Sequence, residues 1–222
     1  MGIHKPKSVG PQDGPPQTQA APAAPVNTNT GRTVRPLASD GPFSTVTPAQ
    51  AEALQRRMAS GKPWTTEQRA ALTLYTGGRF RRINGSLRFG KANPNDLTAA
   101  ATIRTAMREI PQDITVNRIA TGAAFGFPKA MAISPEDAAT LVGRTFHDPG
   151  FTSTTVNSRR GWVRMQISVP AGTRGAYVES ITKNRGETEM ILDAGTHYRI
   201  DRVGRTMEGD TLMYVTVVGQ DD

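Results

Sequence analysis

The chain has 222 residues, a formal net charge of +8 and no cysteine. The lack of cysteine excludes a disulfide framework, a thiolate nucleophile and a cysteine-ligated zinc site. The positive charge favours anionic partners such as nucleic acid, an acidic protein or a ligand with phosphates, although a basic surface that only keeps the chain soluble is the simpler interpretation.

The sequence gives no sign of a metal centre, a membrane span or a secretory signal. Its three histidines, His4, His147 and His197, are scattered along the chain, so we expect no multi-histidine metal site. No apolar run approaches the length of a transmembrane helix. The charged N-terminus is not followed by the apolar segment of a signal peptide. We therefore expect a soluble protein that, if it is secreted or injected, uses no ordinary signal.

Residues 1–47 differ in composition from the rest of the chain. They hold few large apolar side chains and are rich in Pro, Gln, Ala, Thr and Gly. The run from Pro11 to Pro25 cannot bury enough apolar surface to offset chain entropy, so we predict a disordered tail over residues 1–47. Residues 48–222 are long enough for one domain with its own hydrophobic core.

Helical patterns dominate the first half of this domain. Thr47-Pro48-Ala49-Gln50 has the pattern of a capped helix start, and Gly61 and Pro63 end that helix. Further helices are expected over residues 65–75, 79–89, 96–108 and 134–143.

Strand patterns dominate the second half. From Trp162 to Val169, apolar residues alternate with polar ones, which is typical of a half-buried strand. Because the helices come mostly first and the strands follow, the order favours an α+β domain. Further strands are expected over residues 114–118, 150–154, 175–179, 188–192, 197–203 and 212–218.

Three segments indicate chemistry, although each alone also has a purely structural interpretation. Arg118 ends a β-prone run, and its guanidinium could fork onto phosphate oxygens or form a surface salt bridge. The hydroxyls of Gly150-Phe151-Thr152-Ser153-Thr154-Thr155 could hold a carboxylate or a ribose, or belong to an exposed threonine-rich strand. Glu187 and Glu189 share one face at the start of a strand. They could be two functional carboxylates or two solvated charges.

Taken together and in this order, the segments resemble the arginine–serine–glutamate class of ADP-ribosyltransferases. In that class an arginine ends a strand, a Ser-Thr-Ser strand follows Gly-Phe, and Glu-x-Glu lies on a later strand. The helical segment from Tyr75 to Arg88 resembles the family as well, and the whole resemblance covers about residues 70 to 218. Two positions depart from the pattern: Ile119 replaces the glycine that usually follows the arginine, and Thr155 replaces the last serine.

The resemblance implies a fold and an NAD site. The fold would be α+β, with N-terminal helices packed on a core of two mainly antiparallel or mixed β-sheets that form an NAD cleft. Arg118 would grip the NAD pyrophosphate, and Ser153 and Thr154 would also contact NAD. Glu189 would bond the ribose 2′-hydroxyl and stabilise the positive charge that develops as nicotinamide leaves, with Ser153 holding Glu189 in place. This scheme needs no metal.

Glu187 has a separate implied role, which concerns the acceptor. An arginine side chain is protonated at neutral pH and is a poor nucleophile. A carboxylate two residues before Glu189 could orient the guanidinium and help remove its proton. Relatives with Glu-x-Glu modify arginine, whereas those with Gln in first place tend to modify other acceptors. The resemblance therefore implies transfer of ADP-ribose from NAD to an arginine of a target protein, by a toxin, an effector or a phage-delivered enzyme.

Two other functions stay open on the sequence. With water as the acceptor, the same site would make the protein an NAD glycohydrolase. The positive surface would also fit a non-catalytic module that binds nucleic acid. Against that module, the sequence has no recognised nucleic-acid motif and no row of aromatic residues for base stacking.

Overall fold

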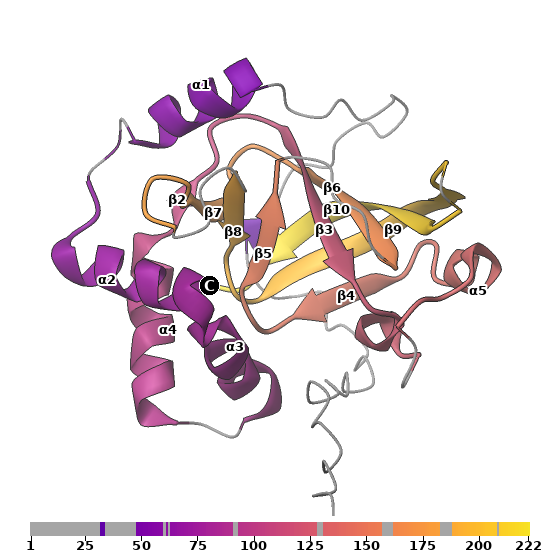
Figure 1. Cartoon of the computed structure of the whole chain (residues 1–222), viewed down its shortest axis with the longest axis horizontal. Helices are drawn as coiled ribbons and strands as arrows, with labels where there is room; N and C mark the ends of the chain where they lie inside the picture. The colour runs from indigo at the N-terminus through magenta and orange to yellow at the C-terminus, as the bar shows by residue number, and fades with distance from the viewer. Residues whose placement is uncertain are drawn as a thin grey trace, which may run out of the picture.

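The computed structural model of the chain describes residues 32–33, 48–59, 61, 63–90, 93–127, 131–156, 162–182, 188–207 and 209–222. Most of the helices gather beside one end of a large sheet, and one short helix lies near the other end (Figure 1). Among these residues, no helix combines the length and the apolar character needed to cross a membrane.

The N-terminal part of the domain is helical, as the sequence predicts. A π-helical turn, Tyr75–Arg79, joins the second and third of its α-helices, which are α1 (Pro48–Ala59), α2 (Thr66–Leu74), α3 (Phe80–Phe89) and α4 (Pro94–Ala106). A capping box starts α2: the Thr65 hydroxyl accepts from the N–H of Gln68, and the Gln68 side chain accepts from the N–H of Thr65. Gly78 has a φ of 114°, which glycine adopts at little cost, and this allows the kink before α3.

Some helix ends differ from the prediction. α4 begins before residue 96 because the Asn93 side chain caps it by accepting from the N–H of Asn95. α5 (Pro135–Ala139) begins after Ser134 as predicted, but it ends early because the chain continues in turns. The predicted N-cap of α1, Thr47, lies outside the described residues.

Strands make up most of the remaining domain. In chain order they are β1 (Arg32–Thr33), β2 (Arg108–Glu109), β3 (Ile114–Ala120), β4 (Thr145–Asp148), β5 (Thr152–Thr155), β6 (Val163–Val169), β7 (Arg174–Tyr177), β8 (Glu189–Leu192), β9 (Thr196–Arg205) and β10 (Thr211–Gln220). Within the described part of the chain they form a path β2-β7-β8-β5-β3-β6-β10-β9-β4, and β1 pairs with β10. β10 runs parallel to β6 and the other pairs are antiparallel, so the sheet is mixed.

The structure corrects the expectation of two separate sheets. The halves β2-β7-β8-β5 and β3-β6-β10-β9-β4 are joined into one sheet where β3 meets β5. That junction holds a single residue pair, Asn117 with Thr155. By contrast, β3 pairs with β6 along its full length from Ile114 to Ala120. The α+β class and the mixed strand order are confirmed, and the two expected sheets correspond to two halves with a thin connection.

The short strands β1, β2 and β4 are not among the strands that the sequence predicts. β1 and β2 have only two residues each, too few for any pattern. β1 also falls inside the predicted tail, where Arg32 pairs with Gln220 and Thr33 with Gly219. The other residues of 1–47 lie outside the described part of the chain, so the disordered tail and its boundary stay predictions.

Two buried apolar clusters hold the domain together. One lies among the strands and includes Val116, Ile167 and Val215 from three neighbouring strands. The other joins the helices to the sheet, with Ile83 of α3 in the same cluster as Ile191 of β8. All five side chains are fully buried, and burial of each such side chain contributes about 1.5–3 kcal/mol. The second cluster fixes the helices against β7, β8 and Phe151, the residue directly before β5.

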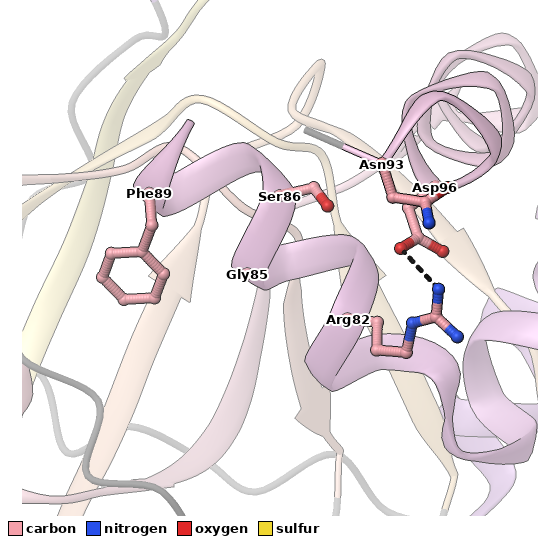
Figure 2. Close-up of a pocket in the computed structure, with 6 residues that line it drawn as sticks. All are labelled: Arg82, Gly85, Ser86, Phe89, Asn93 and Asp96. Carbon is pink, nitrogen blue, oxygen red and sulfur yellow. Dashed lines mark hydrogen bonds and ion pairs between the residues drawn. The ribbon is translucent and has the colours of Figure 1, made fainter. Parts of the chain in front are cut away.

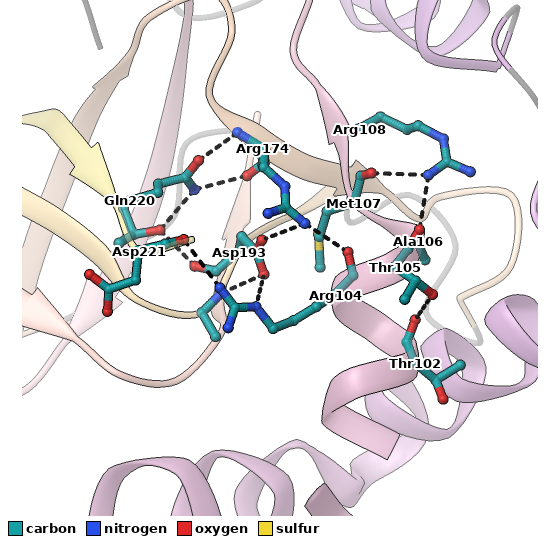
Figure 3. Close-up of polar contacts among 12 residues, drawn as sticks. Thr102, Arg104, Thr105, Ala106, Met107, Arg108, Arg174, Asp193, Gln220 and Asp221 are labelled. Carbon is teal, nitrogen blue, oxygen red and sulfur yellow. Dashed lines mark hydrogen bonds and ion pairs between the residues drawn. The ribbon is translucent and has the colours of Figure 1, made fainter. Parts of the chain in front are cut away.

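A buried carboxylate adds a polar connection between helix and sheet (Figure 3). Asp193 has no exposed surface and lies between Arg174 of β7, at 3.2 Å, and Arg104 of α4, at 3.7 Å. Burial raises the pKa of Asp193, although both arginines act against that rise. The same Arg104 donates to the backbone carbonyl of Asp221 at 3.1 Å. α4 is therefore tied both to β7 and to the segment that follows β10.

The close approach of β7 to β8 predicts the effect of one added methyl group. A Cβ on Gly175 would lie 2.9 Å from the carbonyl oxygen of Ile191, a backbone atom that cannot turn away. Gly175→Ala should therefore lower the free energy of unfolding by about 1–3 kcal/mol, as overpacking does elsewhere. Chemical denaturation of the two proteins measures the difference.

Gly85→Ala is the matched control, because a Cβ on Gly85 would meet nothing within 4 Å. Gly85 lies inside α3, where alanine is favoured over glycine by about 0.5–1 kcal/mol, so this variant should be slightly more stable than the wild type. If both variants were as stable as the wild type, the packing described for β7 and β8 would be wrong.

Candidate active site

Arg118 and Ser153 lie beside the thin junction between β3 and β5. Arg118 Nη1 donates to the backbone carbonyl of Ser153 at 3.3 Å. Both residues are half-buried, and each is close in sequence to the single pair that joins the two strands. The structure therefore brings together the arginine and the serine that the sequence singled out, at the centre of the sheet.

A buried amide connects the hydroxyl-rich strand to the helices. Asn84 of α3 contacts both polar backbone groups of Phe151: its Nδ2 donates to the carbonyl at 3.0 Å, and its Oδ1 accepts from the N–H at 2.9 Å. Asn84 Nδ2 also donates to the Tyr75 hydroxyl at 3.1 Å, and Ser153 Oγ lies 3.4 Å from that hydroxyl. Burial raises the pKa of Tyr75, so its hydroxyl stays protonated and can position Ser153.

An ion pair lies next to this amide. Arg88 of α3 donates through Nε and Nη2 to the two carboxylate oxygens of Asp148, both at 2.8 Å. Asp148 also accepts from the N–H of Gly150 at 3.0 Å and from the Thr152 hydroxyl at 3.1 Å. Burial acts to raise the pKa of Asp148, but the hydrogen bonds and charge of Arg88 outweigh it and lower that pKa below its usual value. The pair is therefore charged at neutral pH.

The glycine before Phe151 has a steric explanation. A Cβ on Gly150 would lie 3.0 Å from Arg88 Nε and 3.0 Å from Asn84 Oδ1. These two side chains of α3 can approach the backbone so closely because residue 150 has no Cβ. The Gly-Phe pair that precedes the hydroxyls is thus the place where α3 meets the backbone of the sheet. Glycine permits this approach without any shift of the two side chains.

The hydroxyls of β5 divide between the two faces of the sheet, because successive residues of a strand point in opposite directions. Thr154 is buried and donates to the carbonyl of Met190 at 2.8 Å, which ties β5 to β8. Ser153 points to the other face, toward Tyr75. The predicted contact of Thr154 with NAD stays a prediction, and in this structure its hydroxyl bonds to the neighbouring strand.

Glu189 begins β8 directly opposite Thr155 of β5. Ser153 pairs with Ile191, so Ser153 and Glu189 are diagonal neighbours on one face, a relation with a Cα separation of roughly 7–8 Å. Glu189 is half-buried. The register thus places the predicted catalytic carboxylate on the same face as the serine that is expected to hold it. Glu187, the other predicted carboxylate, lies outside the described residues, and its role stays a prediction.

A constrained backbone precedes Glu189. Thr188 has a φ of 49°, in the left-handed region that β-branched residues seldom adopt. Its N–H donates to Glu179 Oε2 at 2.7 Å, its carbonyl accepts from the N–H of Val156 at 3.2 Å, and its hydroxyl lies 3.2 Å from that of Thr155. Such conformations persist where the surroundings hold them and often occur at functional sites. Glu179 and Thr188, which the sequence did not single out, therefore fix the direction in which the chain enters β8.

A separate hollow of about 300 Å³ lies between α3 and α4 (Figure 2). Arg82 donates to Asp96 at 3.3 Å across one side of it. None of the residues predicted for NAD or catalysis lines this hollow, which is formed by Arg82, Gly85, Ser86, Phe89, Asn93 and Asp96.

The sequence matches the ADP-ribosyltransferase exoenzymes over residues 47–218. The chain belongs to this family. It is accordingly a toxin-type mono-ADP-ribosyltransferase that uses NAD as its substrate. No curated protein matches the sequence.

Solved structures share the fold of this ADP-ribosyltransferase. Plx2a, an ADP-ribosyltransferase toxin from Paenibacillus larvae, is 22% identical with a TM-score of 0.68, over 77% of this chain and 94% of that one. An ADP-ribosyltransferase from Clostridium botulinum is 17% identical with a TM-score of 0.70, over 80% of this chain and 99% of that one. C3stau2 from S. aureus, solved with NAD, is 15% identical with a TM-score of 0.69, over 81% of this chain and 100% of that one. At these identities the likeness concerns the fold alone.

The lowered pKa of Asp148 predicts how stability depends on pH. The pKa of Asp148 is lower in the folded protein than in the unfolded chain, where it is near 4. The charged carboxylate therefore stabilises the fold at pH values above the unfolded-state pKa. This stabilisation is lost as the pH falls through the folded-state pKa. At neutral pH, Asp148→Asn should lower the free energy of unfolding by about 3 kcal/mol, because Arg88 stays largely buried without its counter-charge. Denaturant unfolding at several pH values measures both effects.

The gap between the wild type and Asp148→Asn should narrow below about pH 4, where the wild type also loses the charge. A gap that stayed constant down to pH 2 would contradict this view of the Arg88–Asp148 pair.

Arg118 predicts the effect of a conservative change on NAD binding. Arg118→Lys keeps the positive charge but loses the planar fork that matches phosphate oxygens, so affinity for a non-hydrolysable NAD analogue should fall at least about tenfold. Calorimetric titration measures this, with Arg205→Lys, an exposed arginine paired with Glu136, as the control. Equal affinities for Arg118→Lys and the wild type would leave Arg118 with only its structural contact to Ser153.

Proposed function

We propose that this ADP-ribosyltransferase transfers ADP-ribose from NAD to an arginine side chain of a target protein. The observation that carries the proposal is the start of β8, where Glu189 faces the hydroxyl-bearing strand and is preceded in the sequence by Glu187 in a Glu-x-Glu pattern. The domain that acts in this way comprises residues 48–222, and residues 1–47 are a tail without a catalytic role.

Arg118 binds the NAD pyrophosphate in this proposal. Three features support the role: Arg118 lies near the end of β3, it is half-buried, and a bond to the Ser153 carbonyl orients its guanidinium. A guanidinium keeps its charge at any working pH and matches two phosphate oxygens at once. The neighbouring Arg88 is paired with Asp148, so the two charges of that pair offset each other.

Glu189 acts on the ribose. Loss of nicotinamide builds positive charge on the ribose, and a fixed carboxylate beside it stabilises that charge where it develops. The left-handed Thr188, held by three contacts, supports a fixed position for Glu189. Ser153 positions Glu189 and is itself positioned by the buried Tyr75 hydroxyl.

Glu187 acts on the acceptor. In the proposed reaction, an acceptor guanidinium nitrogen forms a bond to the ribose C1′, the bond from C1′ to the nicotinamide nitrogen breaks, and nicotinamide leaves. The guanidinium must lose a proton in this step, and Glu187 receives it. With water as the acceptor, the same Glu189 chemistry would give NAD hydrolysis, and Glu187 would not be needed.

The roles of the two glutamates can be distinguished by measuring ADP-ribose transfer and NAD hydrolysis on one sample. Glu189→Gln should reduce transfer and NAD hydrolysis alike, by on the order of 10²–10³, because both need the ribose carboxylate. Glu187→Gln should lose transfer to an arginine analogue such as agmatine while it keeps much of the hydrolysis. Free nicotinamide reports total NAD cleavage, and labelled ADP-ribose on agmatine or on lysate proteins reports transfer.

Glu136→Gln serves as a control, since Glu136 is an exposed carboxylate on α5 and is 72% exposed. If Glu187→Gln lost both reactions together, Glu187 would belong to the NAD site instead of the acceptor site. If transfer to agmatine persisted in that variant, the assignment of arginine as the acceptor would fail while the NAD chemistry stood. If the wild type hydrolysed NAD but labelled no protein in any lysate, the result would favour an NAD glycohydrolase over a transferase.

A further inference from the structure

Two histidines that are far apart in the sequence lie together in the structure. β4 pairs with β9 so that His147 stands directly opposite His197. Their rings are stacked, with centroids 4.5 Å apart and an angle of 18° between the planes. These two histidines, although scattered in the sequence, are therefore neighbours in space, because antiparallel pairing brings distant residues face to face.

A carboxylate completes the group. Asp221, which follows β10, places one oxygen 2.9 Å from Nε2 of His147 and the other 2.9 Å from Nε2 of His197. One nitrogen from each ring and a carboxylate oxygen all lie within 4.8 Å of one another. Both rings thus direct the same type of nitrogen to a single carboxylate.

The position of Asp221 is fixed by the surrounding backbone. Its N–H donates to the carbonyl of Gly195 at 2.9 Å, and its own carbonyl accepts from Arg104 (Figure 3). Gly195 has a φ of 79°, and a Cβ there would lie only 2.6 Å from Asp221 Oδ2. The turn before β9 therefore has room for this carboxylate only because residue 195 is glycine.

We propose that His147, His197 and Asp221 bind a zinc ion, with water from the solvent completing the coordination. Imidazole nitrogens with one carboxylate suit Zn²⁺, whereas Mg²⁺ and Ca²⁺ prefer oxygen ligands throughout. His147 and Asp221 are 35% and 37% exposed at their side chains, which gives the ion access from solvent. This site is independent of the reaction proposed for Glu187 and Glu189.

The three ligand atoms, which lie within 4.8 Å of one another, must move to hold the metal. Tetrahedral zinc with ligand bonds of about 2.0–2.2 Å separates its ligand atoms by roughly 3.3 Å, so the present nitrogen–oxygen separations must open by a few tenths of an ångström. The nearly parallel rings must also tilt, so that each ring plane points at the ion. His147 can make this movement because its ring is partly exposed.

Zinc would join three parts of the chain, namely β4, β9 and the segment after β10. β4 also carries Asp148, the partner of Arg88, on the face opposite to His147. The ion would therefore stabilise a strand that supports the NAD site without contacting that site.

The test uses the untagged full-length protein, freed of metal with a chelator. Calorimetric titration should show one Zn²⁺ per chain. At a zinc concentration of about 100 times the dissociation constant, the melting temperature should rise by roughly 5–10 °C. Co²⁺ should give the visible absorption of a cobalt ion with nitrogen ligands. Failure to bind Zn²⁺ at one per chain would overturn the proposal and leave a hydrogen-bonded cluster only.

Variants locate the ion. His147→Gln and Asp221→Asn should each weaken zinc binding by at least about tenfold, since even loss of a group that only supports a ligand costs 10–100-fold. Asp222→Asn and His4→Gln, which remove a neighbouring carboxylate and the third histidine, should bind zinc as the wild type does. The melting temperature of each metal-free variant shows that it is folded. Unchanged affinity in both ligand variants, or equal losses in the controls, would place the metal elsewhere and overturn the assignment.

Discussion

The contact between the Asn84 side chain and the backbone of Phe151 determines how the helices meet the sheet. The Asn84 amide is buried, and both its nitrogen and its oxygen form hydrogen bonds with the backbone of Phe151. A buried amide that lost these partners would cost about 1–3 kcal/mol for each unsatisfied group, so α3 cannot slide along β5. Tyr75 and Arg88 reach Ser153 and Asp148 from the helices that this contact holds in place. The geometry around the hydroxyl strand thus depends on one side chain.

The two arginines beside this contact have different partners. Arg88 and Asp148 satisfy each other through a forked pair, whereas the bond from Arg118 to Ser153 is made to a neutral carbonyl. The positive charge of Arg118 also helps to lower the pKa of Asp148. Arg88 and its partner Asp148 hold the backbone before β5, whereas Arg118 lies at the middle of the sheet, where the two half-sheets meet.

The sequence predicted the parts of the fold that have a strong local pattern. The alternation in β6 holds from Val163 to Ile167, and the predicted starts of α2 and α5 are confirmed, since burial on one face and a capped first turn leave a direct trace in residue type. β1, β2 and β4 leave no such trace, because they are short and lie at edges. The single sheet was not foreseen either, since one pair, Asn117 with Thr155, decides between one sheet and two. The roles of Asp148, Glu179 and Thr188 depend on hydrogen-bond partners from other elements, and no spacing along the chain reveals those partners.

Gly150 links folding and chemistry in a way that limits how this protein can change. A side chain at residue 150 would press on Asn84 and Arg88 together, and both would have to shift by a few tenths of an ångström. A substitution there would therefore disturb the contact of α3 with the sheet and the surroundings of Ser153 at the same time. Selection for either property therefore removes the same variants, and such a position offers no gradual route toward a new specificity. Diversification would have to occur at positions where a side chain meets solvent or substrate and not the helix layer.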